Sequence, residues 1–164
     1  MNTLMLPKFQ SVVDNKLIRG RAVTCPYRLY KMKHQGINQI IDLRNSSFFQ
    51  APLEKFFCKI LGIKYLRYPY SYRQKHLPDN DFFEKINKTI INNTDGYTYL
   101  HCQHGRSRTG LTVSIYEKTC TRKNDDTIFE NLFNHGFSEF HKGKKGKKAE
   151  KQKNLIFEMI ERYF

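Results

Sequence analysis

Residues 97–110, YTYLHCQHGRSRTG, contain a predicted strand, a loop and the start of a predicted helix, and the fold depends on this order of elements. The first five of them, residues 97–101, are mostly aromatic, β-branched or apolar, a pattern that predicts a buried strand. Residues 108–121 follow with helical spacing, and the apolar side chains expected to face inward are Leu111, Val113 and Ile115. The sequence therefore predicts a short loop that joins the end of a strand directly to the beginning of a helix.

Strands and helices alternate along the rest of the chain. Further strands are predicted at residues 16–19, as an edge strand, and at 37–43 and 63–68. Helices are predicted at residues 25–35, 52–61, 81–92, 125–134 and 150–163. Alternation of this kind requires crossover connections, so we expect a single-domain α/β fold. Its mainly parallel sheet should have about four to five strands, with helices on both faces.

Length and charge narrow the class of protein. The 164 residues suit one domain, 1–164, and 39% of them are apolar, enough for a core. Lys and Arg number 29 against 15 Asp and Glu, so the formal net charge is +14. An excess of this size favours a phosphate-bearing partner, nucleic acid or an anionic surface. The lysine-rich segment 141–153 is predicted to be a surface segment between the last two helices, with a nucleic-acid or anionic-lipid contact as the alternative.

Several classes of protein fit the sequence poorly. The four cysteines, which are Cys25, Cys58, Cys102 and Cys120, show no paired CxxC spacing of the kind that binds zinc. No run approaches the roughly 18 apolar residues of a membrane span, and residues 1–10 lack a long apolar leader segment. We therefore expect a cytoplasmic protein with reduced thiols, and we expect it to be a monomer.

The loop after the predicted strand has the chemistry of an anion site. Backbone N–H groups converge at a helix N-terminus, where the helix dipole also favours negative charge. The same field favours the thiolate form of Cys102. Arg108, six positions later, can bind two oxygens of one phosphate, and Gly105 lets the chain turn tightly between them. These residue types together predict nucleophilic attack by sulfur on phosphorus.

The loop resembles the signature of the protein tyrosine phosphatase superfamily, which is His-Cys, five residues, then Arg and Ser or Thr. Here it runs from His101 and Cys102 to Arg108 and Thr109, followed by Gly110. The segment INQIIDLRN at residues 37–45 resembles the compact dual-specificity branch. The resemblance covers roughly residues 16–135 and implies a cysteine-dependent phosphatase, most simply one that acts on protein tyrosine or with dual specificity.

The resemblance also assigns roles. Cys102 would form a phosphocysteine intermediate, Arg108 would bind the phosphoryl group, Thr109 would help the intermediate hydrolyse, and His101 would orient and tune the cysteine. The phosphate-binding loop would comprise Gln103, His104, Gly105, Arg106 and Ser107. No metal or cofactor is expected, because the loop and the arginine supply the charge stabilisation. Alternatively, His101 is merely packed, and His104 and Arg106 are solvated.

The general acid is harder to identify. Compact members of the superfamily carry an aspartate about thirty residues before the cysteine, but residues 68–73 contain no carboxylate. Asp79 is the first candidate and Asp81 the second, because the plant and fungal branch that acts on inositol pyrophosphates has a similar Pro-Asp at this distance. Asp79 could instead only cap the following helix.

Two other functions remain open from the sequence. The loop is also similar to that of the cysteine-type RNA triphosphatases, so a polyanionic substrate is an alternative: an RNA 5′-triphosphate, an inositol polyphosphate or a phosphoinositide. Arg73, Lys75 and His76 would add to a basic rim suited to such a substrate. The third possibility is a binding module that captures phosphate without hydrolysing it.

Overall fold

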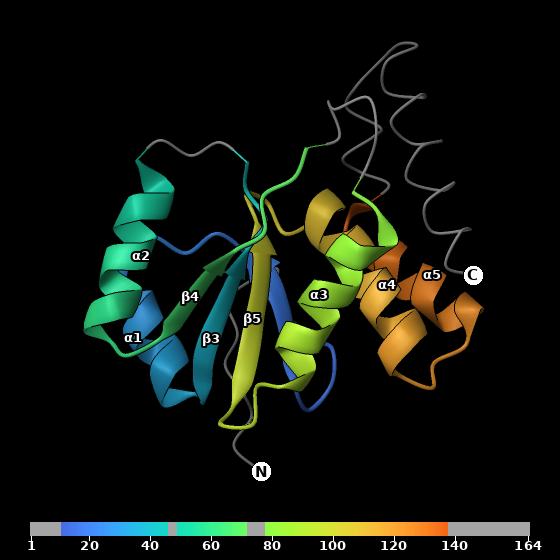
Figure 1. Cartoon of the computed structure of the whole chain (residues 1–164), viewed down its shortest axis with the longest axis horizontal. Coiled ribbons are helices and arrows are strands. Elements are labelled where there is room, and N and C mark those ends of the chain that lie inside the picture. Colours follow the sequence, from blue (N-terminus) through green and yellow to red (C-terminus); the bar gives the residue numbers. More distant parts are fainter. Residues whose placement is uncertain (1–10, 46–48, 72–77, 138–164) are drawn as a thin grey trace.

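A five-stranded sheet organises the computed structural model, which describes residues 11–45, 49–71 and 78–137 (Figure 1). Its strands are β1 (Ser11–Val12), β2 (Leu17–Arg21), β3 (Ile37–Asp42), β4 (Lys64–Arg67) and β5 (Tyr97–Cys102). Their spatial order is β1-β2-β5-β3-β4. Only β1 runs antiparallel to its neighbour; the other pairs are parallel. The sheet is therefore mainly parallel, as predicted.

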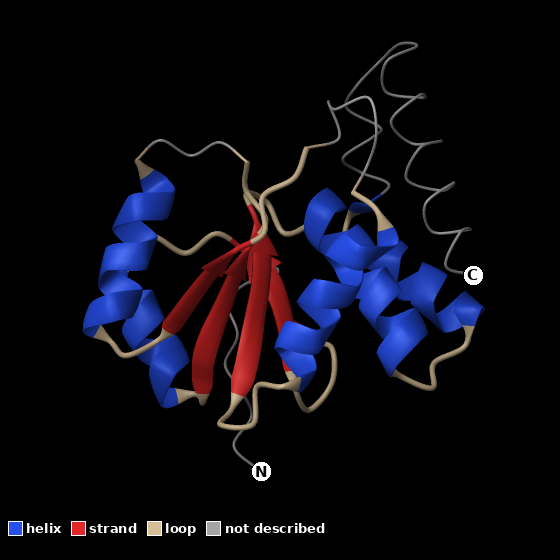
Figure 2. Cartoon of the chain, in the orientation of Figure 1, coloured by secondary structure: helices blue, strands red, loops and turns tan. Residues whose placement is uncertain are grey.

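Helices cover both faces of this sheet. They are α1 (Pro26–His34), α2 (Gln50–Ile60), α3 (Asn80–Ile91), α4 (Ser107–Cys120) and α5 (Asp125–Asn134). Figures 1 and 2 show α1 and α2 on one side of the strands and α3, α4 and α5 on the other. The predicted α/β architecture is confirmed.

Neighbouring residues within the strands belong to two different hydrophobic cores. Leu17, Ile41 and Leu100 pack on the side of α3, α4 and α5. Ile18, Ile40 and Tyr99 pack with residues of α1 and α2. Side chains alternate between the two faces of a strand, so neighbouring residues of a strand can both be apolar when helices cover both faces. This explains why the strands lack the alternation of apolar and polar residues seen in half-exposed sheets.

The predicted edge strand at residues 16–19 is wrong in one respect. It is real as β2, but β1 pairs with it on the outer side, through Ser11 opposite Arg19. A two-residue strand has too few positions to show a pattern, so β1 could not be recognised from the sequence. The predicted helix at 150–163 and the lysine-rich segment 141–153 lie outside the described residues.

Candidate active site

The site forms where the parallel strands end. β5 ends at Cys102, α4 begins at Ser107, and the intervening residues complete the segment that we call the Cys–Arg loop, Cys102–Arg108. Gly105 has φ of +71°, and a Cβ at this position would lie 2.4 Å from the backbone oxygen of Gly20. Only glycine avoids both the strained backbone and this clash with β2. Glycine at position 105 therefore allows the loop to pass this close to β2.

Cys102 lies at the base of this loop and is 4% exposed. Burial by itself would raise the pKa of its thiol, but opposing effects are stronger, and the net result is a lowered pKa. The largest of these come from the Thr109 hydroxyl and the positive charge of Arg108, followed by the backbone N–H groups of Thr109 and His104. The loop thus stabilises a thiolate in a site where burial would otherwise suppress it.

The side chain of Thr109 has a direct effect on this sulfur. Its hydroxyl is fully buried and has no nitrogen or oxygen partner in hydrogen-bonding geometry among the described residues. The hydroxyl contributes to the lowered pKa of Cys102, which favours the sulfur as the group that it stabilises. A donor aimed at sulfur can stabilise the thiolate both as a nucleophile and as a leaving group.

Arg108 is anchored along one edge. Its Nη1 donates to the backbone oxygens of Leu43 at 3.1 Å and Tyr70 at 3.4 Å, and to Oδ1 of Asn45 at 3.3 Å. Its Nε and Nη2 donate to no described residue in the structure. A guanidinium held on one side can offer its other two donors to two oxygens of one phosphoryl group. Tyr70 supports this helix start further, because its hydroxyl donates to the backbone oxygen of Arg108 at 2.8 Å.

Arg19 is a second buried arginine at the loop, and the sequence analysis did not identify it. It is 2% exposed, and its Nη2 donates to the backbone oxygen of Gly105 at 3.2 Å. Burial lowers its pKa to about 10, while the charges of Glu117 and Cys102 act in the opposite direction. It stays a cation at neutral pH and holds the backbone carbonyl of Gly105 in the loop. The arginine in the apolar run LIRGR was the available signal.

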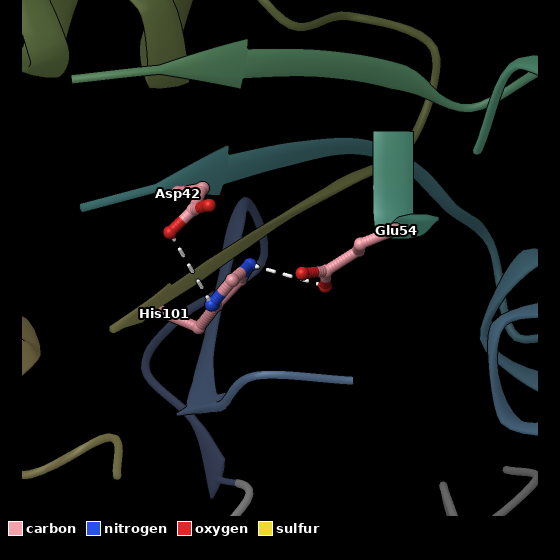
Figure 3. A group of neighbouring side chains, drawn as sticks. All are labelled: Asp42, Glu54 and His101. Atoms are coloured by element: carbon pink, nitrogen blue, oxygen red, sulfur yellow. Dashed lines mark ion pairs between the residues drawn. The ribbon is translucent and has the colours of Figure 1, made fainter. Parts of the chain in front are cut away.

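His101 is buried behind the loop between two carboxylates. Figure 3 shows Asp42 from β3, Glu54 from α2 and His101 from β5 converging on one point. His101 Nε2 lies 3.3 Å from Glu54 Oε1, and its Nδ1 lies 3.2 Å from the backbone oxygen of Cys102. Burial lowers the pKa of the imidazole, but the carboxylates of Glu54 and Asp42 outweigh it, so the net pKa is raised.

Arg44 completes this buried group. Its Nε donates to Asp42 Oδ1 at 2.8 Å, and its Nη2 contacts Glu54 Oε2 and, at 2.8 Å, Asp42 Oδ2. Asp42, Glu54 and His101 lie close enough together to resemble a metal site. However, Arg44 already bridges both carboxylates, and the raised pKa of His101 favours a second positive charge beside them. We therefore interpret the four residues as a charge-balanced network that holds His101 against the Cys102 peptide.

The network should make the free energy of unfolding depend on pH, and the substitution Glu54→Gln can reveal this dependence. The pKa of His101 is raised in the folded protein, so its contribution is complete below about pH 6.5, its ordinary pKa. That contribution is lost as the pH rises through the folded value. Glu54→Gln leaves a buried cation without its partner, and we expect it to cost roughly 3–5 kcal/mol at pH 6. This deficit should shrink at alkaline pH, where His101 is neutral.

Denaturant unfolding at several pH values measures this effect. Cys102→Ser should be the background for all variants, because the lowered pKa of Cys102 gives an opposite pH dependence over a similar range. Glu84→Gln, which removes an exposed carboxylate paired with Lys88 on α3, is the matched control. A deficit for Glu54→Gln that stays constant from pH 6 to alkaline pH would contradict the assignment of a charged His101.

The two candidate acids, Asp79 and Asp81, have different surroundings. Asp79 is exposed and caps α3, its Oδ1 accepting a hydrogen bond from the Phe82 N–H at 3.0 Å. Asp81 lines a groove of about 980 Å³ between α3 and β4, and no residue of the Cys–Arg loop lines this groove. The sequence places no Asp or Glu at residues 43–53, 68–78 or 103–116. Asp79 therefore stays a prediction, as the first candidate for the acid.

The remaining loop residues occupy varied positions. Gln103 is half-buried, and its Nε2 donates to Gln50 Oε1 at the start of α2, at 3.2 Å. His104 is exposed and Arg106 is half-buried, whereas Ser107 is buried at the first position of α4. The structure therefore brings the predicted loop residues and His101 together. Arg73, Lys75 and His76 lie outside the described residues.

A family model and several solved structures match the chain. The model, described as "DSP-PTPase phosphatase fused to NAD+ Kinase", matches residues 5–155. No curated protein matches the sequence. Among the described residues, no helix is long and apolar enough to cross a membrane.

The solved structures have the same fold at low sequence identity. The core catalytic domain of the PP-IP phosphatase SIW14 from S. cerevisiae is 19% identical with a TM-score of 0.69, over 99% of this chain and 89% of that chain. PTPMT1 is 16% identical with a TM-score of 0.65, over 94% and 95%. TpbA from P. aeruginosa, in complex with pTyr, is 15% identical with a TM-score of 0.61, over 81% and 82%.

Proposed function

Because the chain belongs to the family of dual-specificity protein tyrosine phosphatases described as fused to NAD+ kinase, we propose that it hydrolyses phosphomonoesters through Cys102. The chain is a phosphatase of the protein tyrosine phosphatase superfamily, and we propose the substrate and the roles of the residues. One observation carries it. A buried thiol with a lowered pKa lies under a loop of N–H donors, beside a guanidinium that is anchored along one edge only. We propose phosphotyrosyl protein as the substrate, with dual specificity allowed.

The reaction would proceed in two steps. The Cys102 thiolate attacks phosphorus, an S–P bond forms, and the P–O bond to the substrate oxygen breaks. Arg108 and the loop N–H groups stabilise the charge on the three equatorial oxygens. Water then attacks the phosphocysteine, inorganic phosphate leaves, and the thiolate is regenerated. The Thr109 hydroxyl assists this second step, because it stabilises the sulfur as its negative charge returns.

Asp79 would give a proton to the departing oxygen and later take one from the attacking water. Of the phosphorylated amino acids, phosphotyrosine is the one best suited to such an exposed acid. A phenolate, with a pKa of about 10, is a far better leaving group than the alkoxide of serine. Phosphotyrosyl peptides are therefore expected to be hydrolysed faster than phosphoseryl peptides of the same sequence.

Asp79→Asn separates the acid from the helix cap. Asparagine caps helices about as well as aspartate, so the fold should be unaffected while the proton donor is lost. We expect kcat/KM for a phosphotyrosyl peptide, which reports the step in which the leaving group departs, to fall by roughly 10²-fold. For p-nitrophenyl phosphate, whose leaving group needs less protonation, the fall should be much smaller. Steady-state kinetics on both substrates measure the difference.

Asp81→Asn is the matched control, two positions away on the same helix turn, and should behave as the wild type. An equal loss for Asp79→Asn on both substrates would exclude Asp79 as the acid. A loss for Asp81→Asn alone would transfer the role to Asp81.

A polyanionic substrate is the second candidate, and the net charge of +14 favours it. The similarity in fold to SIW14, named as a PP-IP phosphatase, is in keeping with it. A pyrophosphate leaving group needs little protonation, so an exposed acid would suffice. Comparing kcat/KM on phosphotyrosyl peptide, triphosphorylated RNA and inositol pyrophosphate decides the matter. A preference of orders of magnitude for either anion would replace the protein substrate, and tight phosphopeptide binding without phosphate release would indicate a binding module.

A further inference from the structure

The outer face of α2 carries apolar side chains where a surface helix normally carries polar ones. Ala51, Glu54 and Cys58 form its buried side. On the opposite side, Leu53, Phe56 and Ile60 are 46%, 57% and 64% exposed, at a spacing of three and then four residues. That spacing places them in one stripe along the helix. α2 is therefore apolar on both sides, which its packing against the sheet does not require.

Positive charge accompanies this stripe. Lys55 and Lys59 are exposed and lie one helical turn apart, on either side of Phe56 in the sequence. The only acidic residue of α2 is Glu54, which is buried in the network with His101 and Arg44. We call Leu53, Phe56, Ile60, Lys55 and Lys59 the α2 face. It presents apolar and cationic groups and no exposed carboxylate.

The neighbouring helix has the same character. α1 and α2 contact one another and lie on the same side of the sheet (Figure 1). α1 contains no acidic residue, and its exposed side chains include Tyr27, Tyr30 and Lys31. Aromatic rings and lysines on one exposed surface match the chemistry of the membrane interface, where rings enter the headgroup region and lysines reach lipid phosphates.

We propose that the α2 face docks on an anionic lipid surface, with Leu53, Phe56 and Ile60 among the headgroups and Lys55 and Lys59 on lipid phosphates. Charge argues against a second copy of the chain, because two such faces would bring like charges together. Nucleic acid would use the lysines but not the apolar stripe. A fluid bilayer, by contrast, accepts protruding apolar side chains without a matching groove.

Docking through the α2 face would also affect the position of the Cys–Arg loop. α2 begins at Gln50, whose side chain is hydrogen-bonded to Gln103 of the Cys–Arg loop. Contact along α2 would therefore hold the loop beside the membrane surface, where membrane-bound phosphate-bearing substrates are concentrated. The docking itself does not depend on catalysis, so it is tested separately.

Vesicle co-sedimentation of the full chain tests the proposal, using phosphatidylcholine alone or with about 30 mol% phosphatidylserine. Binding is expected only to the anionic vesicles and should weaken as salt is raised. Phe56→Gln/Ile60→Gln and Lys55→Gln/Lys59→Gln should each reduce binding by roughly tenfold or more. Ile91→Gln is the matched control, since it removes an exposed apolar residue of α3 on the other face of the sheet.

Hydrolysis of a soluble aryl phosphate by each variant provides the second readout and should equal that of the wild type. Unchanged vesicle binding in Phe56→Gln/Ile60→Gln would overturn the proposal, as would equal binding to neutral vesicles. So would a dimer in analytical ultracentrifugation that this double substitution dissociates, because the face would then belong to a second copy. Nucleic-acid binding that only the lysine substitutions weaken, without vesicle binding, would also overturn it.

Discussion

Cys102→Ser is expected to reduce turnover of an aryl phosphate by about 10⁴-fold or more, to the background of the assay. A serine hydroxyl is far less acidic than a thiol and stays protonated, whereas the loop lowers the pKa of the cysteine thiol. Substrate should still bind, because Arg108 and the loop N–H groups remain. Phosphate release and the affinity for a phosphotyrosyl peptide should therefore separate, the first lost and the second retained.

Cys25→Ser is the matched control, since that thiol is exposed and lies outside the loop. Alkylation supplies an independent check. Burial, with a smaller effect of Glu54, raises the pKa of Cys58 to about 12, while the pKa of Cys102 is lowered. Iodoacetate at neutral pH should thus modify Cys102 before Cys58, and bound phosphate should protect it. Substantial turnover by the serine variant would remove Cys102 from its proposed role.

Arg108→Lys is expected to lower kcat/KM by roughly 10²–10⁴-fold although the charge is kept. A lysine cannot bind two oxygens with parallel donors, and it cannot at the same time hold the backbone oxygens of Leu43 and Tyr70. The pKa of Cys102 should change little, because a positive charge remains near the sulfur. The pH dependence of alkylation distinguishes this loss of geometry from a loss of thiolate.

Arg106→Lys is the comparison within the same loop. Arg106 is half-buried and precedes the first residue of α4; it belongs to the predicted phosphate-binding loop, but no bidentate role is proposed for its side chain. We expect a change of less than about tenfold for it. Equal losses for the two substitutions would mean that total positive charge, and not the bidentate geometry of Arg108, determines the rate.

The sequence was informative where one segment forms one part of the site. Residues 97–110 contain the end of β5, the loop and the start of α4, so His101, Cys102, Arg108 and Thr109 could be identified from one short segment. The alternation of strands and helices similarly predicted a sheet covered on both faces, which the two hydrophobic cores confirm. Local pattern was sufficient here because adjacent residues also lie together in space.

The sequence was less informative where parts of the site come from distant segments. Glu54 reads as an ordinary polar residue of α2, and only the crossover from β3 brings it to His101. Arg19 lies inside an apolar strand, and its partner is a backbone oxygen, for which no sequence pattern exists. Asp79 fits both a cap and an acid, and the structure establishes the cap but does not assign the proton transfer.

Trapping the covalent intermediate tests the central claim most directly. The full chain, and the Asp79→Asn variant in parallel, would be mixed with a phosphotyrosyl peptide, quenched in acid within the first turnover and analysed by mass spectrometry. We predict one phosphoryl group on the Sγ of Cys102. A phosphoryl group on His101 or His104, or an unmodified enzyme at a time when phosphate is being released, would contradict it.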